Sequence, residues 1–223
     1  MSRFDGLKAE FTAENFRRFA IYCCIPAVIF YLVSLAAMGL GGFTLVETLR
    51  DPAQITKQSS FLGFVSSIGA WLWVAAATVC FFRIAAVTWN DNDPHRMLLV
   101  LCGWFSAFLA VDDFFLIHDR FITEGILIPL YALFVGYLLR KYYTKIKEID
   151  AFAFLMAGGM LAMSVLVDAV QEILPISYGL SQALEEGFKF VGAASWFYFC
   201  YRIAAYRLTG AVTGQSQSPS ASE

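Results

Sequence analysis

Residues 105–120 read FSAFLAVDDFFLIHDR, and the interpretation of the whole chain starts from them. Two neighbouring aspartates, Asp112 and Asp113, lie inside an apolar run, and His118 and Asp119 follow almost at once. An ionisable side chain in a membrane-spanning segment is energetically costly and indicates a functional site. Two adjacent carboxylates are harder still to explain by packing alone. The question for the other segments is therefore which of them place charged residues at the same depth in the membrane.

The composition is that of a polytopic membrane protein. Of the 223 residues, 59% are hydrophobic and 15% are charged, and the mean hydropathy is +0.63. A soluble domain carries roughly a quarter of charged residues. The chain has no basic cluster suited to nucleic acid and no glycine-rich phosphate loop, which excludes nucleic acid as a partner. The two histidines exclude a multi-histidine metal centre. The five cysteines form no CxxC pair, so we predict buried thiols and no disulfides.

The apolar runs predict an all-α fold, a bundle of six transmembrane helices. Each run is long enough to cross a hydrocarbon core of roughly 30 Å at about 1.5 Å per residue. The spans are placed at about residues 16–41, 61–87, 95–117, 125–142, 151–174 and 183–206. Residues 1–15 are predicted to form an amphipathic segment, residues 16–207 the transmembrane domain, and residues 208–223 a disordered Ser/Gly-rich tail.

Local signals predict details of these helices. Asp93 and Pro94 predict a helix start, with the aspartate as N-cap and the proline in the first turn. Pro26 predicts a kink in the first span. Gly158 and Gly159 predict close helix packing along the fifth span.

The basic residues predict the orientation in the membrane. Most of the sixteen Lys and Arg residues fall on the side that holds both chain ends. Lys and Arg are enriched in cytoplasmic segments, so both termini are predicted to be cytoplasmic. We expect a multi-pass protein of a plasma or inner membrane, with membrane lipid as its surroundings.

The predicted topology brings charge from several spans to one layer. Asp112 lies about 24 Å, and Asp168 about 26 Å, from the cytoplasmic start of its span. Both therefore lie near the outer-leaflet end of a core that is roughly 30 Å thick. Glu172 follows Asp168 by one turn on the same face. The sixth span enters this layer from outside and adds three charged residues, Glu185, Glu186 and Lys189.

Helical geometry suggests which acids share a cleft. Asp112 and Asp119 are seven residues apart and would lie on one face of the third span, with His118 beside them. Asp113 points about 100° away and must face another helix or the far wall of the cleft.

The charge count predicts a divalent metal ion. Seven acids meet only two fixed positive charges, those of Lys189 and Arg120, and His118 could add a third. A low-dielectric layer cannot hold so many unpaired carboxylates ionised, so some must be protonated, hydrated or bound to a cation. Oxygen ligands with one imidazole suit calcium, magnesium, manganese or zinc, and the sequence does not choose between them. The predicted metal ligands are Asp112, Asp113, His118, Asp119, Asp168 and Glu172.

These residues favour a metal-dependent hydrolase that acts on a lipid or a lipid-linked substrate at the outer leaflet. The metal would lower the pKa of a bound water. Glu185 or Glu186 would act as the base, with His118 as a ligand or a base. Lys189 would stabilise developing negative charge.

Two other classes of protein fit the same residues. A transporter or channel subunit would use the acids to bind and relay a cation or protons. A non-catalytic interaction protein would use them as a structural ion-pair network, and Lys189 could simply pair with Glu185 or Glu186 on its own helix. Charge inside the membrane at one end only favours a site over a transport pathway. The oligomeric state stays open.

Overall fold

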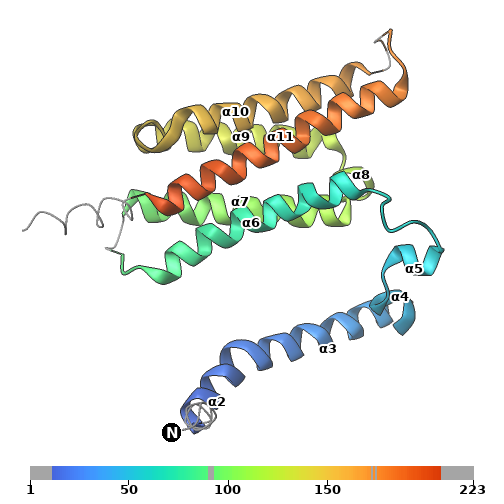
Figure 1. Ribbon diagram of the computed structural model, residues 1–223, viewed down its shortest axis with the longest axis vertical. Coiled ribbons are helices and arrows are strands. Elements are labelled where there is room, and N and C mark those ends of the chain that lie inside the picture. The colour runs from blue at the N-terminus through green and yellow to red at the C-terminus, as the bar shows by residue number, and fades with distance from the viewer. Residues whose placement is uncertain (1–11, 90–92, 172, 174, 207–223) are drawn as a thin grey trace, which may run out of the picture. The chain divides into compact units, whose positions relative to one another are not determined.

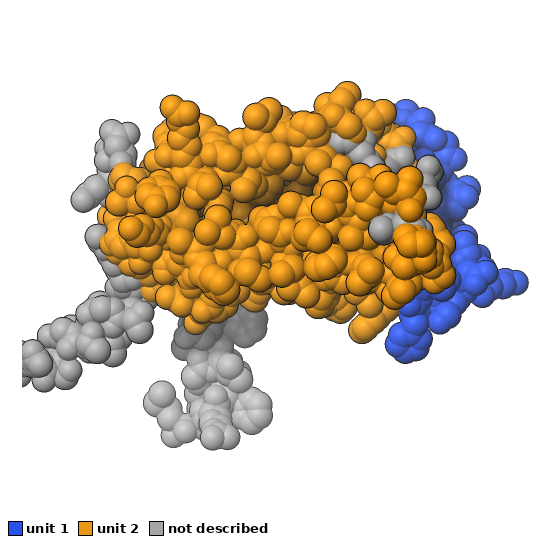
Figure 2. All heavy atoms as spheres, turned by 90° about the horizontal axis from the view of Figure 1, so that it is seen from above, with its two compact units in different colours: residues 1–62 blue, residues 63–223 orange. Residues whose placement is uncertain are grey.

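The computed structural model describes residues 12–89, 93–171, 173 and 175–206, and within these ranges the secondary structure is helical, with no strand. The side chains of Asn15, Asp119 and Glu124 are outside the description. The chain divides into two compact units, residues 1–62 and residues 63–223, which are coloured separately in Figure 2. Each unit is described by itself.

Unit 1 is built on one apolar helical segment. It comprises α2 (Ala13–Phe19), the π-helix η1 (Ala20–Cys24) and α3 (Ile25–Leu40). The π-helix ends at Cys24, two residues before Pro26. A proline within a helix removes one hydrogen bond and clashes with the carbonyl four residues earlier, and a wider turn relieves that clash. A π-helix is thus present just ahead of Pro26, and the kink predicted from this proline stays a prediction.

Two short helices complete unit 1, α4 (Leu45–Leu49) and α5 (Pro52–Thr56). A capping box starts α4, in which Thr44 Oγ1 accepts from the backbone N–H of Glu47 and the Glu47 carboxylate accepts from the backbone N–H of Thr44. The Thr44 hydroxyl also donates to that carboxylate over 2.7 Å. These hydrogen bonds, the hydroxyl first, hold the pKa of Glu47 below its ordinary value.

Unit 2 is a helical bundle (Figure 1). Its long helices pack as α10 against α11, α11 against α6, and α6 against α7. The Asp93 carboxylate accepts from the backbone N–H of His95 over 2.8 Å, which confirms the predicted helix start at Asp93 and Pro94. The helices are α6 (Phe64–Ala86), α7 (Pro94–Phe115), α8 (Ile117–Arg120), α9 (Glu124–Lys141), α10 (Tyr143–Val170) and α11 (Tyr178–Ala205).

The last two helices begin earlier than the sequence predicts. In α10 the backbone is non-helical at Asp150, with φ −171° and ψ 82°. The Asp150 carboxylate accepts from the backbone N–H of Ala153 over 3.0 Å, so the apolar part restarts where the sequence predicts it. Ahead of this kink, residues 143–149 are helical too. In α11 the side chain of Ser177 acts as the N-cap, and the helix starts at Tyr178, ahead of the predicted start at residue 183.

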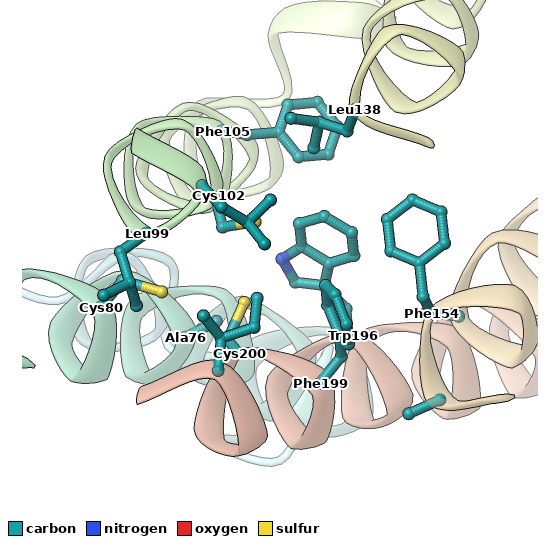
Figure 3. Close-up of a cluster of buried hydrophobic side chains, with 14 of the residues drawn as sticks. Ala76, Cys80, Leu99, Cys102, Phe105, Leu138, Phe154, Trp196, Phe199 and Cys200 are labelled. Carbon is teal, nitrogen blue, oxygen red and sulfur yellow. The ribbon is translucent and has the colours of Figure 1, made fainter. Parts of the chain in front are cut away.

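The core of unit 2 is centred on Trp196, which Figure 3 shows among aromatic residues from several helices. Its ring centroid lies 5.5 Å from that of Phe105 and 5.9 Å from that of Phe199. The indole N–H donates to Ser106 Oγ over 2.8 Å, and both partners are buried. This hydrogen bond satisfies a polar group that would be costly to leave unpaired in an apolar core.

The cysteine prediction is correct for unit 2 and wrong for unit 1. Cys80, Cys102 and Cys200 are free thiols in the core, from α6, α7 and α11 (Figure 3). Cys23 is exposed and Cys24 is half-buried, because the apolar helix Phe16–Leu40 buries none of its residues among the described parts of unit 1.

Close helix approach occurs at glycines other than the predicted ones. A Cβ at Gly192 would lie 2.7 Å from Leu161 Cγ, and one at Gly103 would lie 2.9 Å from Phe81 Cε1. A Cβ at Gly158 or Gly159 would meet nothing within 4 Å. The close contact between α10 and α11 is therefore provided by the glycine of α11, against a leucine of α10.

Four helices are long and apolar enough to cross a membrane: Phe16–Leu40, Phe64–Ala86, Pro94–Phe115 and Tyr143–Val170. They correspond to the first, second, third and fifth predicted spans. The other two predicted spans are the helices α9 and α11, which do not contain a stretch that is long and apolar enough to be counted with these four. Of the predicted terminal segments, residues 1–11 and 207–223 lie outside the described residues.

Candidate functional site

The double aspartate lies in the last turn of α7, just before the chain reverses. The helix ends at Phe115, and Leu116 has left-handed backbone angles, with φ 52° and ψ 47°. Such angles are uncommon for a residue other than glycine. The short helix α8 starts at the next residue, which turns His118 back towards the end of α7.

Asp112 holds this turn together and is 3% exposed. Its Oδ1 accepts from the backbone N–H of His118 over 2.9 Å and lies 3.0 Å from His118 Nδ1. Its Oδ2 accepts from the hydroxyl of Tyr131, on α9, over 2.7 Å. An ionised carboxylate can only accept, so it requires the proton of the imidazole to be on Nδ1. Both carboxylate oxygens of Asp112 are therefore engaged.

Asp113 faces a different pair of helices. Its Oδ1 lies 2.8 Å from Lys189 Nζ on α11, and its Oδ2 accepts from the indole N–H of Trp73 on α6 over 2.8 Å. The side chain of Asp113 is 10% exposed and that of Lys189 is 29% exposed. This is a largely buried ion pair with an additional hydrogen bond, the arrangement that a charge in an apolar layer requires.

The two aspartates therefore belong to two separate centres on two flanks of α7. One joins α7 to α8 and α9, and the other joins α7 to α6 and α11. The helix is broken at Leu116, between Asp112 and Asp119, so one continuous helix does not carry both residues. The side chain of Asp119 is outside the description, and the shared cleft stays a prediction. The contact of Lys189 with Asp113 reaches across to another helix, beyond the local pairing with Glu185 or Glu186 that the sequence allows.

A third polar group joins the end of α10 to the start of α11. Asp168 accepts from Gln171 Nε2 over 2.7 Å. Gln182 Nε2 lies 3.3 Å from Gln171 Oε1 and donates to Glu185 over 2.8 Å. Two predicted site residues, Asp168 and Glu185, are thus linked through two glutamine amides. The predicted ligand Glu172 lies outside the described residues.

A hollow opens between α6, α7 and α11 beside the Lys189–Asp113 pair. Its lining combines charged and hydroxyl side chains with apolar ones. It is lined by Val65, Ser66, Gly69, Trp73, Asp113, Glu186, Lys189, Phe190 and Ala193. The start of α6, the end of α7 and the start of α11 lie at the same end of unit 2 (Figure 1). The hollow therefore belongs to the layer in which the sequence predicts the site.

Within the described ranges, no three His, Cys, Asp or Glu side chains lie together so that they could hold a metal ion. The pairing of Asp113 with Lys189 and of Asp112 with His118 also reduces the excess of acid on which the metal prediction was based. The metal site stays a prediction, because the side chains of Asp119 and Glu172 are outside the description.

Sequence reasoning missed four residues that complete these centres. Tyr131 and Trp73 each donate to one of the aspartates, and Gln171 and Gln182 link two of the acids. Gln171 and Gln182 could have been identified from the sequence, since an amide next to an apolar segment needs a hydrogen-bond partner. Trp73 and Tyr131 carry none, because aromatic residues are frequent throughout this chain.

The described residues form an all-helical structure whose four long apolar helices suggest a membrane-embedded protein, with a buried polar layer at one end of the larger unit. A family model described as a domain of unknown function, DUF8692, matches residues 23–203, and the chain belongs to that family. No curated protein and no solved structure matches the chain.

Proposed function

We propose that the protein is a membrane enzyme that hydrolyses a lipid or a lipid-linked substrate, with His118 as its general base. In this proposal α9 and α11 also cross the membrane, which makes six spans with both termini in the cytoplasm. The polar end of unit 2 then lies at the outer leaflet, within reach of lipid headgroups and water.

One observation carries the proposal, the 3.0 Å contact between His118 Nδ1 and Asp112 Oδ1. A carboxylate that holds Nδ1 orients the ring and fixes its tautomer, so that the lone pair is on Nε2. The backbone N–H of His118 is held by the same oxygen, which fixes the position of the imidazole further. A histidine held in this way suits general base catalysis.

The proposed hydrolysis moves one proton from water to His118 and then from His118 to the leaving group. Nε2 would take a proton from a water molecule as its oxygen attacks the carbonyl or phosphoryl centre of the substrate. The bond from that centre to the leaving group then breaks, and the leaving group takes the proton from the imidazolium. Asp112 would stabilise the imidazolium, and Tyr131 would keep the carboxylate in place through its hydroxyl.

A divalent metal ion remains part of the proposal as an aid to this base. The Nε2 lone pair cannot bind a metal and take a proton at the same time, so the ion would be held by the predicted acid ligands of the layer while His118 acts as the base. The ion would lower the pKa of the attacking water. Zinc, calcium, magnesium and manganese each remain to be tested.

The experiment is hydrolysis by the purified protein in nanodiscs. The substrates are a phospholipid, a ceramide and a polyprenyl diphosphate lipid, with products identified by mass spectrometry. We expect one class to be hydrolysed, and His118→Ala and Asp112→Asn to slow the reaction by about 10²-fold or more. Lys145→Met, at the opposite end of unit 2, serves as the control variant. Chelation with EDTA and return of each ion separates metal-dependent from metal-free hydrolysis. Equal rates in His118→Ala and wild type would refute the proposed base.

Transport is the second candidate, and the buried Lys189–Asp113 pair favours it. A charged pair between two helices inside an apolar layer is a common element of proton- and cation-coupled transporters. The same nanodisc protein, moved to liposomes with a pH-sensitive dye inside, tests it. Proton or cation flux that Asp113→Asn abolishes, without any hydrolysis, would support transport.

A structural network is the third candidate. It is favoured by the four elements that the two aspartates join to α7, namely α6, α8, α9 and α11. In that case His118→Ala and Asp112→Asn lower stability, and neither hydrolysis nor flux is found.

A further inference from the structure

The hollow between α6, α7 and α11 contains an acid for which the described residues supply no partner. Asp113 is matched by Lys189 and by the indole N–H of Trp73. The carboxylate of Glu186 makes no hydrogen bond or ion pair with any residue within the described ranges. Ser66 adds a hydroxyl to the same lining. The hollow thus has one more negative than positive charge, and it presents hydrogen-bond acceptors.

These features select one kind of ligand by exclusion. An anion would meet the Glu186 carboxylate, and the nearby ammonium of Lys189 already lies 2.8 Å from Asp113. A purely apolar ligand would cover Glu186 without supplying a hydrogen bond, which is unfavourable. A primary ammonium supplies one positive charge and three N–H donors. The lining offers acceptors for them in Glu186, Ser66 and Asp113.

The remaining lining suits an ammonium that carries an apolar group. Trp73 borders the hollow with 2% of the residue exposed, and its indole N–H is bonded to Asp113. Val65, Phe190 and Ala193 provide apolar surface beside the charged groups. Val65 and Ser66 are exposed, so the hollow is open on the side of α6.

We propose that this hollow is a binding site for a primary ammonium group, as carried by an amine-bearing lipid headgroup. The site lies on the flank of α7 that faces α6 and α11, whereas the Asp112–His118 pair lies on the flank that faces α8 and α9. Binding here is therefore separate from the hydrolysis proposed above and does not depend on it.

Two lipids with the same net charge test the proposal. Phosphatidylethanolamine carries three N–H donors, whereas phosphatidylcholine carries a trimethylated nitrogen and none. Native mass spectrometry of the protein released from nanodiscs containing equal amounts of both measures which lipid stays bound. We expect phosphatidylethanolamine to be retained about tenfold over phosphatidylcholine, as a hydrogen bond to a charged group warrants. Added ethanolamine that displaces the lipid would show that the site also accepts the free amine, and no displacement would assign it to the lipid.

Glu186→Gln should abolish the preference, and Glu185→Gln, on the same helix but bonded to Gln182 and outside the hollow, should keep it. Ser66→Ala, which removes a single acceptor, should reduce the preference in part even if Glu186→Gln fails to fold. Equal retention of the two lipids by wild type would overturn the proposal. So would an unchanged preference in Glu186→Gln, or stronger retention of an anionic phosphatidylglycerol.

Discussion

Replacing Lys189 by methionine tests the buried ion pair in the most direct way. The change keeps the length and apolar stem of the side chain and removes its charge. At 2.8 Å and an effective dielectric constant of about 20, the attraction between the charges of Lys189 and Asp113 amounts to roughly 6 kcal/mol. The loss of hydration offsets much of this attraction. Removing one partner nevertheless leaves the other charge buried, which typically costs about 3–5 kcal/mol.

Protonation of Asp113 sets an upper limit to this cost in stability. A carboxylate left without its ammonium can be neutralised by a proton. Protonating an ordinary aspartate at pH 7 costs about 4 kcal/mol, and at pH 5.5 about 2 kcal/mol. We therefore expect Lys189→Met to lose about 3–4 kcal/mol of unfolding free energy at pH 7, and about 2 kcal/mol less at pH 5.5. Asp113→Asn should cost less, since Lys189 is 29% exposed and its long stem can carry the charge to water.

Equilibrium unfolding in mixed micelles of increasing SDS content, followed by tryptophan fluorescence and circular dichroism, measures these differences. The matched control is Lys145→Met. Lys145 lies at the same 2.8 Å from Glu148, but the acid is 40% exposed and is three residues away on the same helix. Such exposed pairs contribute about 0–1 kcal/mol. If Lys189→Met costs no more than Lys145→Met, or if its cost does not change with pH, the reasoning about a buried charge is wrong.

Contacts elsewhere in the protein lead us to expect three further outcomes. Gly192→Ala should cost about 1–3 kcal/mol of unfolding free energy because its Cβ would overlap a leucine side chain, whereas Gly158→Ala should be nearly neutral. Ser106→Ala should cost about 1–3 kcal/mol in the same assay, because it leaves the buried indole N–H of Trp196 without an acceptor. NMR titration should place the pKa of Glu47 below that of an ordinary glutamate, and removal of its capping hydroxyl should raise it. The capping box therefore stabilises α4 above the ordinary titration range of glutamate, and this contribution is lost as the pH falls through the lowered pKa; a pKa at the ordinary value would contradict it.

The sequence predicts the helices well, because their signals are local. Long apolar runs, the N-cap at Asp93 and the restart of α10 after Asp150 all depend on residues within a few positions of each other. The predicted close packing at Gly158 failed because a small residue permits a close approach without requiring one. Whether a partner helix meets it depends on how the helices are rotated, which no local pattern encodes.

The sequence predicts the depth at which the acids of the candidate site lie, but it does not predict which side chain pairs with each acid. Residue depth follows from helix rise alone, and the acids do gather at one end of unit 2. The partner of each acid depends on which side chains neighbouring helices present. The single continuous helix expected across Asp112 and Asp119 is interrupted by the left-handed turn at Leu116, and a leucine gives no warning of such a turn. The shared cleft of the two aspartates stays a prediction.

The adjacency of Asp112 and Asp113 has a consequence for how α7 tolerates changes in length. Successive residues on a helix are rotated by about 100°, so the two carboxylates together fix the rotational phase of α7 against its neighbours. A single-residue deletion between Gly103 and Asp112 would turn each carboxylate away from its partners and leave two buried acids without donors at once. Single-residue deletions should therefore fall into two sharply different classes, one for changes in α7 ahead of the aspartates and one for changes in the loop of residues 121–123, where no such phase has to be kept.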